Sequence, residues 1–172
     1  MRIVYIDCLG TPIGELCVAV SDGLALAVHR RSRVLEIARR YSPDVREGGE
    51  ARELAEELRE YFEVGRASFS FDPAMPVNPL RAAVYSEVRR IPYGSTATYG
   101  EIARRVGTHP RVVGHALRRN EVLILVPCHR VVGARGLGGF ELGPRAKEIL
   151  LNLERAGKPL GNSLTPRGLS RV

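Results

Sequence analysis

Residues 120–132 read Asn-Glu-Val-Leu-Ile-Leu-Val-Pro-Cys-His-Arg-Val-Val, an apolar run that ends at Pro127 and is followed by Cys128, His129 and Arg130. A cysteine reacts as the thiolate, which an apolar surrounding disfavours and a neighbouring imidazole or guanidinium favours. This segment therefore indicates a nucleophilic cysteine, although a buried cysteine is also a common small core residue. On an extended strand successive side chains point to opposite faces, so His129 would reach the sulfur through a water or a rotated loop.

Two short helices joined by a tight turn are predicted just before this segment. Thr98-Tyr99-Gly100-Glu101 has the spacing of a capping box and opens the first helix, which ends near Gly107. Pro110 starts the second helix, over residues 111–119. Such a pair forms a helix-turn-helix, whose second helix enters a groove of DNA. A solvated basic face is the alternative interpretation of this helix, whose arginines are Arg111, Arg118 and Arg119.

The first half of the chain has the pattern of a strand meander followed by helices. Strands are predicted at residues 2–7, 14–21 and 24–29, separated by Gly-, Pro- and Asp-containing turns. Helices are predicted at 33–41 and 51–64, a further strand at 68–71, and a proline-punctuated connector at 72–77.

A second domain is predicted to begin at Asn78. This residue and Pro79 are typical of a helix N-cap and a first helical position, so a helix is predicted from here to about residue 90. A glycine-dense loop at 133–139 precedes a helix at 145–156, which Gly157 is expected to close. From Lys158 onward a loosely packed basic tail is expected. The predicted division is therefore 1–77, 78–157 and 158–172.

Residues 78–157 resemble the O6-alkylguanine-DNA alkyltransferases, a family of direct-reversal DNA repair proteins, through the long ordered match around Pro-Cys-His-Arg. One departure is Glu121, where many members carry proline. The resemblance implies an α+β fold: an N-terminal ribonuclease-H-like α/β domain with antiparallel strands, and a mainly helical, winged-helix-like C-terminal domain with the helix-turn-helix. It also implies a monomer that transfers the alkyl group of O6-alkylguanine in double-stranded DNA to its own cysteine, once per molecule and without cofactor or metal. Action on O4-alkylthymine stays open.

The resemblance assigns the reacting groups. Cys128 matches the alkyl acceptor, His129 the residue that deprotonates it through a water, and Glu154 the carboxylate that orients the imidazole, in the logic of a serine triad. Tyr99 matches the phenol that donates toward the guanine ring. Asn120 matches the asparagine that braces the active-site turn. Each of three of these residues has an alternative role. Glu154 could be a helix carboxylate, Tyr99 a helix cap and Asn120 a helix C-cap.

The resemblance also assigns the contacts to DNA and to the base. Arg111 matches the arginine that fills the stack when a nucleotide is flipped out, and Arg118 and Tyr99 also face the DNA. Leu117 matches a residue that lines the base pocket, with Val131 and the backbone of Phe140 and Glu141 on the opposite wall. Glu141 departs from the serine of some members.

Other classes of function are kept as alternatives. A lesion-binding module without transfer activity would lack the reactive cysteine, which is intact here. A helix-turn-helix regulator with a sensory cysteine would need a further DNA-binding domain. A cysteine hydrolase would leave the basic helix pair unexplained.

The composition suits an intracellular, DNA-binding protein. The net charge of +7 and pI near 9.8 suit a polyanionic partner, although arginine-rich proteomes produce the same bias. Lys147 and Lys158 are the only lysines and glutamine is absent, so a thermophilic source is a hypothesis. The sequence has neither a membrane span nor a signal peptide, so a cytoplasmic location is expected.

The three cysteines argue against a disulfide framework, because their number is odd and small. Cys8 and Cys17 could pair across adjacent strands, particularly in a thermophile, but unpaired core or loop cysteines are favoured. A metal site that adds His29 is not expected, since no compact four-ligand pattern is present.

Overall fold

The computed structural model describes residues 2–164, and of 158–164 only the backbone helix. The chain divides into two compact units, one of Met75–Arg155 and one formed by the rest. Both helices and strands are present, so the expected α+β class is confirmed. No helix among the described residues is long and apolar enough to cross a membrane.

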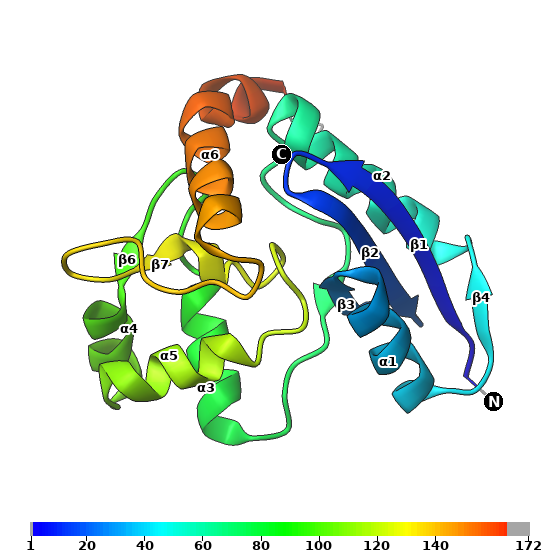
Figure 1. Cartoon of the computed structure of the whole chain (residues 1–172), viewed down its shortest axis with the longest axis horizontal. Coiled ribbons are helices and arrows are strands. Elements are labelled where there is room, and N and C mark those ends of the chain that lie inside the picture. Colours follow the sequence, from blue (N-terminus) through cyan, green and yellow to red (C-terminus); the bar gives the residue numbers. More distant parts are fainter. Residues whose placement is uncertain (1, 165–172) are drawn as a thin grey trace. The chain divides into compact units, whose positions relative to one another are not determined.

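The N-terminal unit is built on a five-stranded sheet with the order β4-β1-β2-β3-β5 (Figure 1). The meander of β1 (Val4–Thr11), β2 (Gly14–Ser21) and β3 (Leu24–His29) is antiparallel, as expected from the turn residues between the strands. Two short strands lie parallel to its edges: β4 (Val45–Glu47) beside β1, and β5 (Asp72–Pro73) beside β3.

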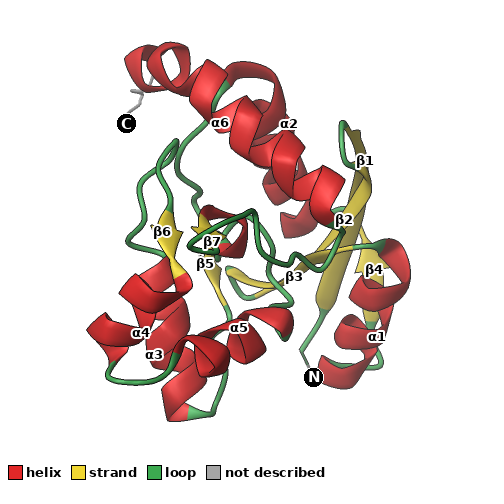
Figure 2. Cartoon of the chain, turned by 60° about the vertical axis from the view of Figure 1, so that its left-hand side comes forward, coloured by secondary structure: helices red, strands yellow, loops and turns green. Residues whose placement is uncertain are grey.

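Helices α1 (Arg31–Tyr41) and α2 (Glu50–Val64) cover the two faces of this sheet (Figure 2). Side chains of a strand alternate between faces. In β2, Cys17 and Ala19 therefore join the core under α1, together with Val34 and Ile37 of that helix. The largest fully buried side chains of this unit include Leu16, Ile37, Leu54, Leu58 and Tyr61.

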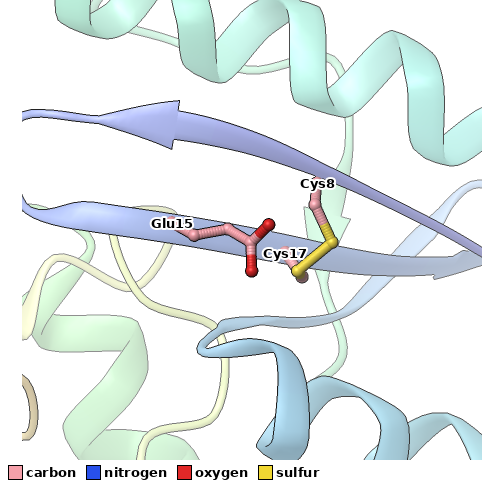
Figure 3. A group of neighbouring side chains, drawn as sticks. All are labelled: Cys8, Glu15 and Cys17. Carbon is pink, nitrogen blue, oxygen red and sulfur yellow. A yellow bond between two sulfur atoms is a disulfide. The ribbon is translucent and has the colours of Figure 1, made fainter.

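Cys8 and Cys17 form a disulfide across β1 and β2 (Figure 3). The antiparallel register places the two residues directly opposite each other, with their Cα atoms 4.0 Å apart. The preference for unpaired cysteines was therefore wrong. Among the described residues, one group could hold a metal ion, and it consists of these two cysteines and Glu15. Because the two sulfur atoms are bonded to each other, they are not available as thiolate ligands.

The strand predicted at 68–71 is absent, and the connector after it supplies β5 instead. Glu57 explains the difference, because its carboxylate accepts hydrogen bonds from both the backbone N–H and the hydroxyl of Ser70. The carboxylate of Glu57 thus accepts the backbone hydrogen bond that a neighbouring strand would otherwise accept. Pro73 lacks an N–H and is tolerated because β5 lies at the edge of the sheet.

The second unit is mainly helical. It contains α3 (Pro79–Val88), α4 (Tyr99–Val106), α5 (Pro110–Arg118) and the first part of α6 (Pro144–Leu164). A two-stranded parallel sheet pairs β6 (Ala97–Thr98) with β7 (Val131–Val132). The predicted capping box is present, since Thr98 and Glu101 each accept from the other's backbone N–H. A three-residue turn joins α4 to α5, whose N-cap is His109.

The last helix is longer than predicted. Gly157 was expected to close it, but α6 continues to Leu164, so the expected loose tail does not begin at residue 158. A glycine within a helix costs about 1 kcal/mol but does not by itself end the helix. The remainder of the predicted tail, residues 165–172, lies outside the described residues.

Candidate functional site

Cys128 opens a single turn of 3₁₀ helix, η1 (Cys128–Arg130), that follows an irregular apolar segment. The extended strand considered for this segment is not formed. Ile124 has a φ of 72°, and the N–H of Leu125 donates to the carbonyl of Leu123 at 2.8 Å, which makes a γ-turn. A positive φ is rare for a β-branched residue, so the surrounding contacts must hold this turn in place.

Asn120 supplies such contacts. Its Oδ1 accepts from the N–H of Val122 at 3.0 Å, and its Nδ2 donates to the carbonyl of Val126 at 2.9 Å. The same Nδ2 lies 3.2 Å from the Sγ of Cys128 and donates to it. Asn120 is 2 % exposed, so one buried amide fixes both ends of the turn and orients the sulfur.

The thiol of Cys128 is protonated at neutral pH in the free protein. Burial raises its pKa to about 11, although the hydrogen bond from Asn120 and the charge of Lys147 act in the opposite direction. The side chain is only 5 % exposed. A base is therefore needed to remove the thiol proton during any reaction.

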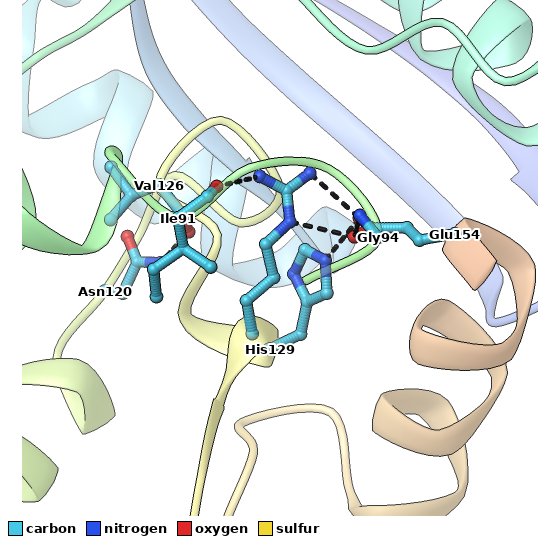
Figure 4. A network of polar contacts seen from close by, with 7 residues as sticks. Ile91, Gly94, Asn120, Val126, His129 and Glu154 are labelled. Atoms are coloured by element: carbon cyan, nitrogen blue, oxygen red, sulfur yellow. Dashed lines mark hydrogen bonds and ion pairs between the residues drawn. The ribbon is translucent and has the colours of Figure 1, made fainter. Parts of the chain in front are cut away.

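A buried network of charged groups lies next to this cysteine in the sequence and centres on Glu154 (Figure 4). One carboxylate oxygen accepts from the Nε2 of His129 at 2.7 Å and from the Nη2 of Arg130 at 3.0 Å. The other accepts from the Nε of Arg130 at 2.8 Å and from the N–H of Gly94 at 3.1 Å. The third guanidinium contact of Arg130 is the carbonyl of Ile91, at 2.8 Å.

These contacts determine which nitrogen of His129 can act as a base. Burial opposes the charge on Glu154, but the hydrogen bonds and charges of His129 and Arg130 lower its pKa overall, so Glu154 is ionised. Its partner Nε2 therefore carries a proton. Burial lowers the pKa of His129, which is thus neutral with a lone pair on Nδ1. That atom is buried and has no hydrogen-bond partner among the described residues, so it is left to accept a proton.

Arg130 does not have the role first expected for it. Its guanidinium was expected to favour the thiolate, but it is bound to Glu154 and to the carbonyl of Ile91. The cation that acts on the thiol is Lys147, whose side chain is fully buried. Its Nζ donates to the carbonyls of Val131 and Gly139, at 2.6 and 2.9 Å.

Neither the role of Lys147 nor the contacts of Arg130 were predicted from the sequence. Lys147 lies in the first part of a helix, where a lysine is usually solvated, and is one of only two lysines in an arginine-rich chain. That rarity was the available signal. Burial lowers the pKa of this lysine to about 8, which leaves it largely charged at neutral pH.

We predict that Lys147→Met slows any reaction of Cys128 about tenfold at pH 7 and moves its pH profile to higher pH. The physical reason is that the cation lowers the pKa of the thiol, so its loss raises that pKa further. Rates of thiol modification between pH 6 and pH 10 measure the shift, with Lys147→Arg as the charge-retaining control. A slower reaction with an unchanged pH profile would contradict an effect of Lys147 on the thiol pKa. Its role would then be only to hold the carbonyls of Val131 and Gly139 in place.

Cys128 opens into a pocket of about 440 Å³ within this unit. The pocket is lined by Tyr99, Gly114, Leu117, Arg118, Cys128, Gly139, Phe140 and Glu141. One wall is packed closely, because a Cβ added at Gly138, whose φ is +76°, would lie 2.7 Å from the hydroxyl oxygen of Tyr99. Glycine at this position thus leaves room for the phenol of Tyr99.

The structure brings most of the predicted site residues together. The residues that line the pocket with Cys128 include Tyr99, Leu117, Phe140 and Glu141. Asn120 donates to the sulfur of Cys128, and His129, the next residue in the sequence, is bound to Glu154. Val131 contributes its carbonyl to Lys147, whereas its side chain is buried outside the pocket lining. Arg118 is exposed at the pocket, and Arg111 is exposed in the first turn of α5, outside the pocket lining.

A buried cysteine at an open pocket, followed in sequence by a neutral histidine that is bound to a carboxylate, is the arrangement expected of a protein with a nucleophilic cysteine. Comparison with known proteins identifies the family to which this protein belongs. Residues 79–156 match the family model described as "6-O-methylguanine DNA methyltransferase, DNA binding domain". Two similar relatives, both called methylated-DNA--protein-cysteine methyltransferase, come from Metallosphaera sedula and Methanopyrus kandleri.

The first relative is 46% identical over 102 residues, which are 59% of this chain and 65% of the relative. The second is 48% identical over 104 residues, 60% of this chain and 79% of the relative. The chain thus spans just under two thirds of the first relative's length. The crystal structure of Mycobacterium tuberculosis O6-methylguanine methyltransferase is 31% identical, with a TM-score of 0.77 over 89% of this chain and 93% of that one. This protein belongs to the O6-methylguanine-DNA methyltransferase family.

Proposed function

We propose that this protein repairs DNA by transferring the alkyl group of O6-alkylguanine to its own Cys128. The observation that carries the proposal is the arrangement around that sulfur: a thiol at a pocket of about 440 Å³, next in sequence to a histidine whose Nδ1 is buried and free to accept a proton. The relatives named as methyltransferases support the same reaction. No cofactor is required, because the damaged base brings the alkyl group.

In this proposal, the groups near Cys128 remove the proton of its thiol and stabilise the resulting charge. Nδ1 of His129 takes the thiol proton through a water, while Glu154 holds the imidazole in the tautomer that leaves this nitrogen free. Asn120 and Lys147 stabilise the negative charge that appears on the sulfur.

The residues of the pocket then receive the leaving group. The sulfur forms a bond to the alkyl carbon as the bond from that carbon to O6 breaks, and the electron pair stays with the guanine. The hydroxyl of Tyr99 donates toward the guanine ring, and the proton that the guanine gains balances the one that Cys128 loses. The product is a thioether, which has no carbonyl for water to attack. Each molecule therefore acts once.

We propose that α4 and α5 form a helix-turn-helix and that α5 enters the DNA. Its exposed Arg111 is at the first turn, where an arginine can fill the stack that a flipped nucleotide leaves. A related structure, that of Mycobacterium tuberculosis OGT, is a complex with DNA, at 29% identity and a TM-score of 0.76. This likeness supports double-stranded DNA as the partner.

The finer assignments of the fold are part of this proposal. We infer a ribonuclease-H-like domain over residues 1–77 and a winged-helix-like domain over 78–157. The compact unit Met75–Arg155 supports the second of these two ranges. A monomeric state, a cytoplasmic location and a thermophilic source stay predictions. The alternative of a lesion-binding module is less supported, because the free thiol of Cys128 is present in the site.

The test is the intact mass of the protein after mixing with duplex DNA that contains one O6-methylguanine. We expect a gain of one methyl group, saturating at one per molecule, and no gain with undamaged duplex. Tight binding to the damaged duplex without a mass gain would contradict the proposal and favour the lesion-binding module.

A further inference from the structure

Two side chains in the pocket lining carry a charge, Arg118 and Glu141. Both are exposed, and neither forms a hydrogen bond or ion pair with another described residue. Their charges are therefore not neutralised by a partner within the described part of the chain. A charge that is free in a binding pocket acts on whatever group the pocket receives.

Glu141 is close enough to the reacting sulfur for its charge to matter. Its negative charge raises the pKa of the Cys128 thiol, whereas Lys147 lowers it. The positions of the two cations differ: the amine of Lys147 is fully buried and tied to two carbonyls, and Arg118 is at the exposed end of α5. Among the described residues that line the pocket with Cys128, Glu141 is the one that bears a carboxylate.

We propose that the side chain of Glu141 determines which alkyl groups are accepted, by disfavouring adducts that carry a negative charge. The inference rests on the proposed transfer to Cys128 and names the substrate class of that same pocket. A methyl or other neutral group is not affected by the carboxylate beyond a uniform effect on the thiol. A substituent that bears a carboxylate would enter a pocket lined by the carboxylate of Glu141, and like charges several ångströms apart repel each other.

The carboxylate of Glu141 also raises the pKa of the Cys128 thiol, which affects the transfer rate of every substrate equally. Absolute transfer rates therefore do not isolate its effect on specificity. The ratio of two transfer rates does, because the common effect on the thiol cancels. The informative pair of probes is duplex DNA with one O6-methylguanine and the same duplex with one O6-carboxymethylguanine. Transfer in both cases joins the sulfur to the first carbon of the substituent and leaves the electron pair on the guanine.

The experiment compares wild-type protein with Glu141→Gln, which removes the charge and keeps the size. We expect the ratio of carboxymethyl to methyl transfer, followed by intact mass under single-turnover conditions, to increase about tenfold in the variant. The matched control is Glu148→Gln, which removes one charge from an exposed residue of α6 outside the pocket lining and is expected to leave the ratio unchanged.

A ratio in Glu141→Gln that stays within twofold of wild type would overturn the role of Glu141. An equal increase in Glu148→Gln would also overturn it, because the effect would then come from net charge alone. Failure of the wild-type protein to take up a methyl group is a separate result, which would contradict the proposed function itself.

Discussion

Replacing Cys128 by alanine is expected to abolish alkyl transfer completely while lesion binding is retained. The variant lacks the sulfur, and no other thiol can replace it, because Cys8 and Cys17 are joined in a disulfide. Little else should change in the pocket. The Nδ2 of Asn120, which loses its contact with the sulfur, keeps its hydrogen bond to the carbonyl of Val126.

Two measurements check this expectation: intact mass after incubation with O6-methylguanine duplex, and equilibrium binding of the same duplex. We expect no methyl adduct on Cys128→Ala, and a dissociation constant for damaged duplex within about tenfold of the wild-type value. A methyl adduct on the alanine variant would show that another residue is the acceptor. The control Cys128→Ser has a hydroxyl in place of the thiol and is expected to be equally inactive, since an alcohol is a far weaker nucleophile without strong activation.

Replacing Glu154 by glutamine is expected to impair both stability and transfer. The side chain is fully buried and is the shared partner of His129 and Arg130. Removing one member of a buried ion pair leaves the other charge uncompensated and costs about 3–5 kcal/mol of the free energy of unfolding. Transfer should slow by on the order of 10³-fold or more, because His129 loses the group that fixes its tautomer. Thermal unfolding and single-turnover transfer measure the two effects.

The pH dependence of stability separates the charge of Glu154 from its packing. Its pKa is lowered in the folded protein, so the unfolded state binds more protons as the pH falls below about 4.5, the ordinary value of a glutamate. The stabilisation by this carboxylate is thus present above pH 4.5 and is lost below it. We expect wild type to lose more stability than Glu154→Gln between pH 4.5 and pH 3.

Glu148→Gln is the matched control for Glu154→Gln, because Glu148 is an exposed glutamate of the same helix. It should unfold and react as wild type does. An equal loss of stability in the two variants would contradict the structural role of the buried network. A Glu154→Gln variant that is destabilised but transfers at the wild-type rate would contradict the orienting role of the carboxylate.

Much of this structure was predictable because local signals and tertiary contacts agree. The turn between the second and third strands, the cap at Asn78 and the capping box at Thr98 all act over a few residues, and each is formed as predicted. Side chains far apart in sequence were harder to place. Arg130 follows His129 directly, yet its partner is Glu154, and nothing local distinguishes that pairing from a contact with the thiol.

Register explains why the disulfide was not preferred. The strands were expected to end at residue 7 and restart at 14, but β1 runs on to Thr11, which pairs with Gly14. In an antiparallel pair that pairing places Cys8 opposite Cys17. The number of cysteines says nothing about which residues of two strands lie opposite each other. Because that number is odd and small, it favoured unpaired cysteines. The irregular turn at Ile124 was equally hidden, because apolar runs of this kind usually form strands.

Under the proposed transfer, the disulfide between Cys8 and Cys17 also allows the molecules that have not yet reacted to be counted by their free thiols. Of the three cysteines in the chain, two are already oxidised, so an unused molecule has one free thiol and a molecule that has accepted an alkyl group has none. Denaturing the protein without reductant and titrating its thiols would then count directly the molecules still able to act. A purified or stored preparation is assayed in this way without any DNA, and the thiols missing from one per molecule give the fraction that has already reacted.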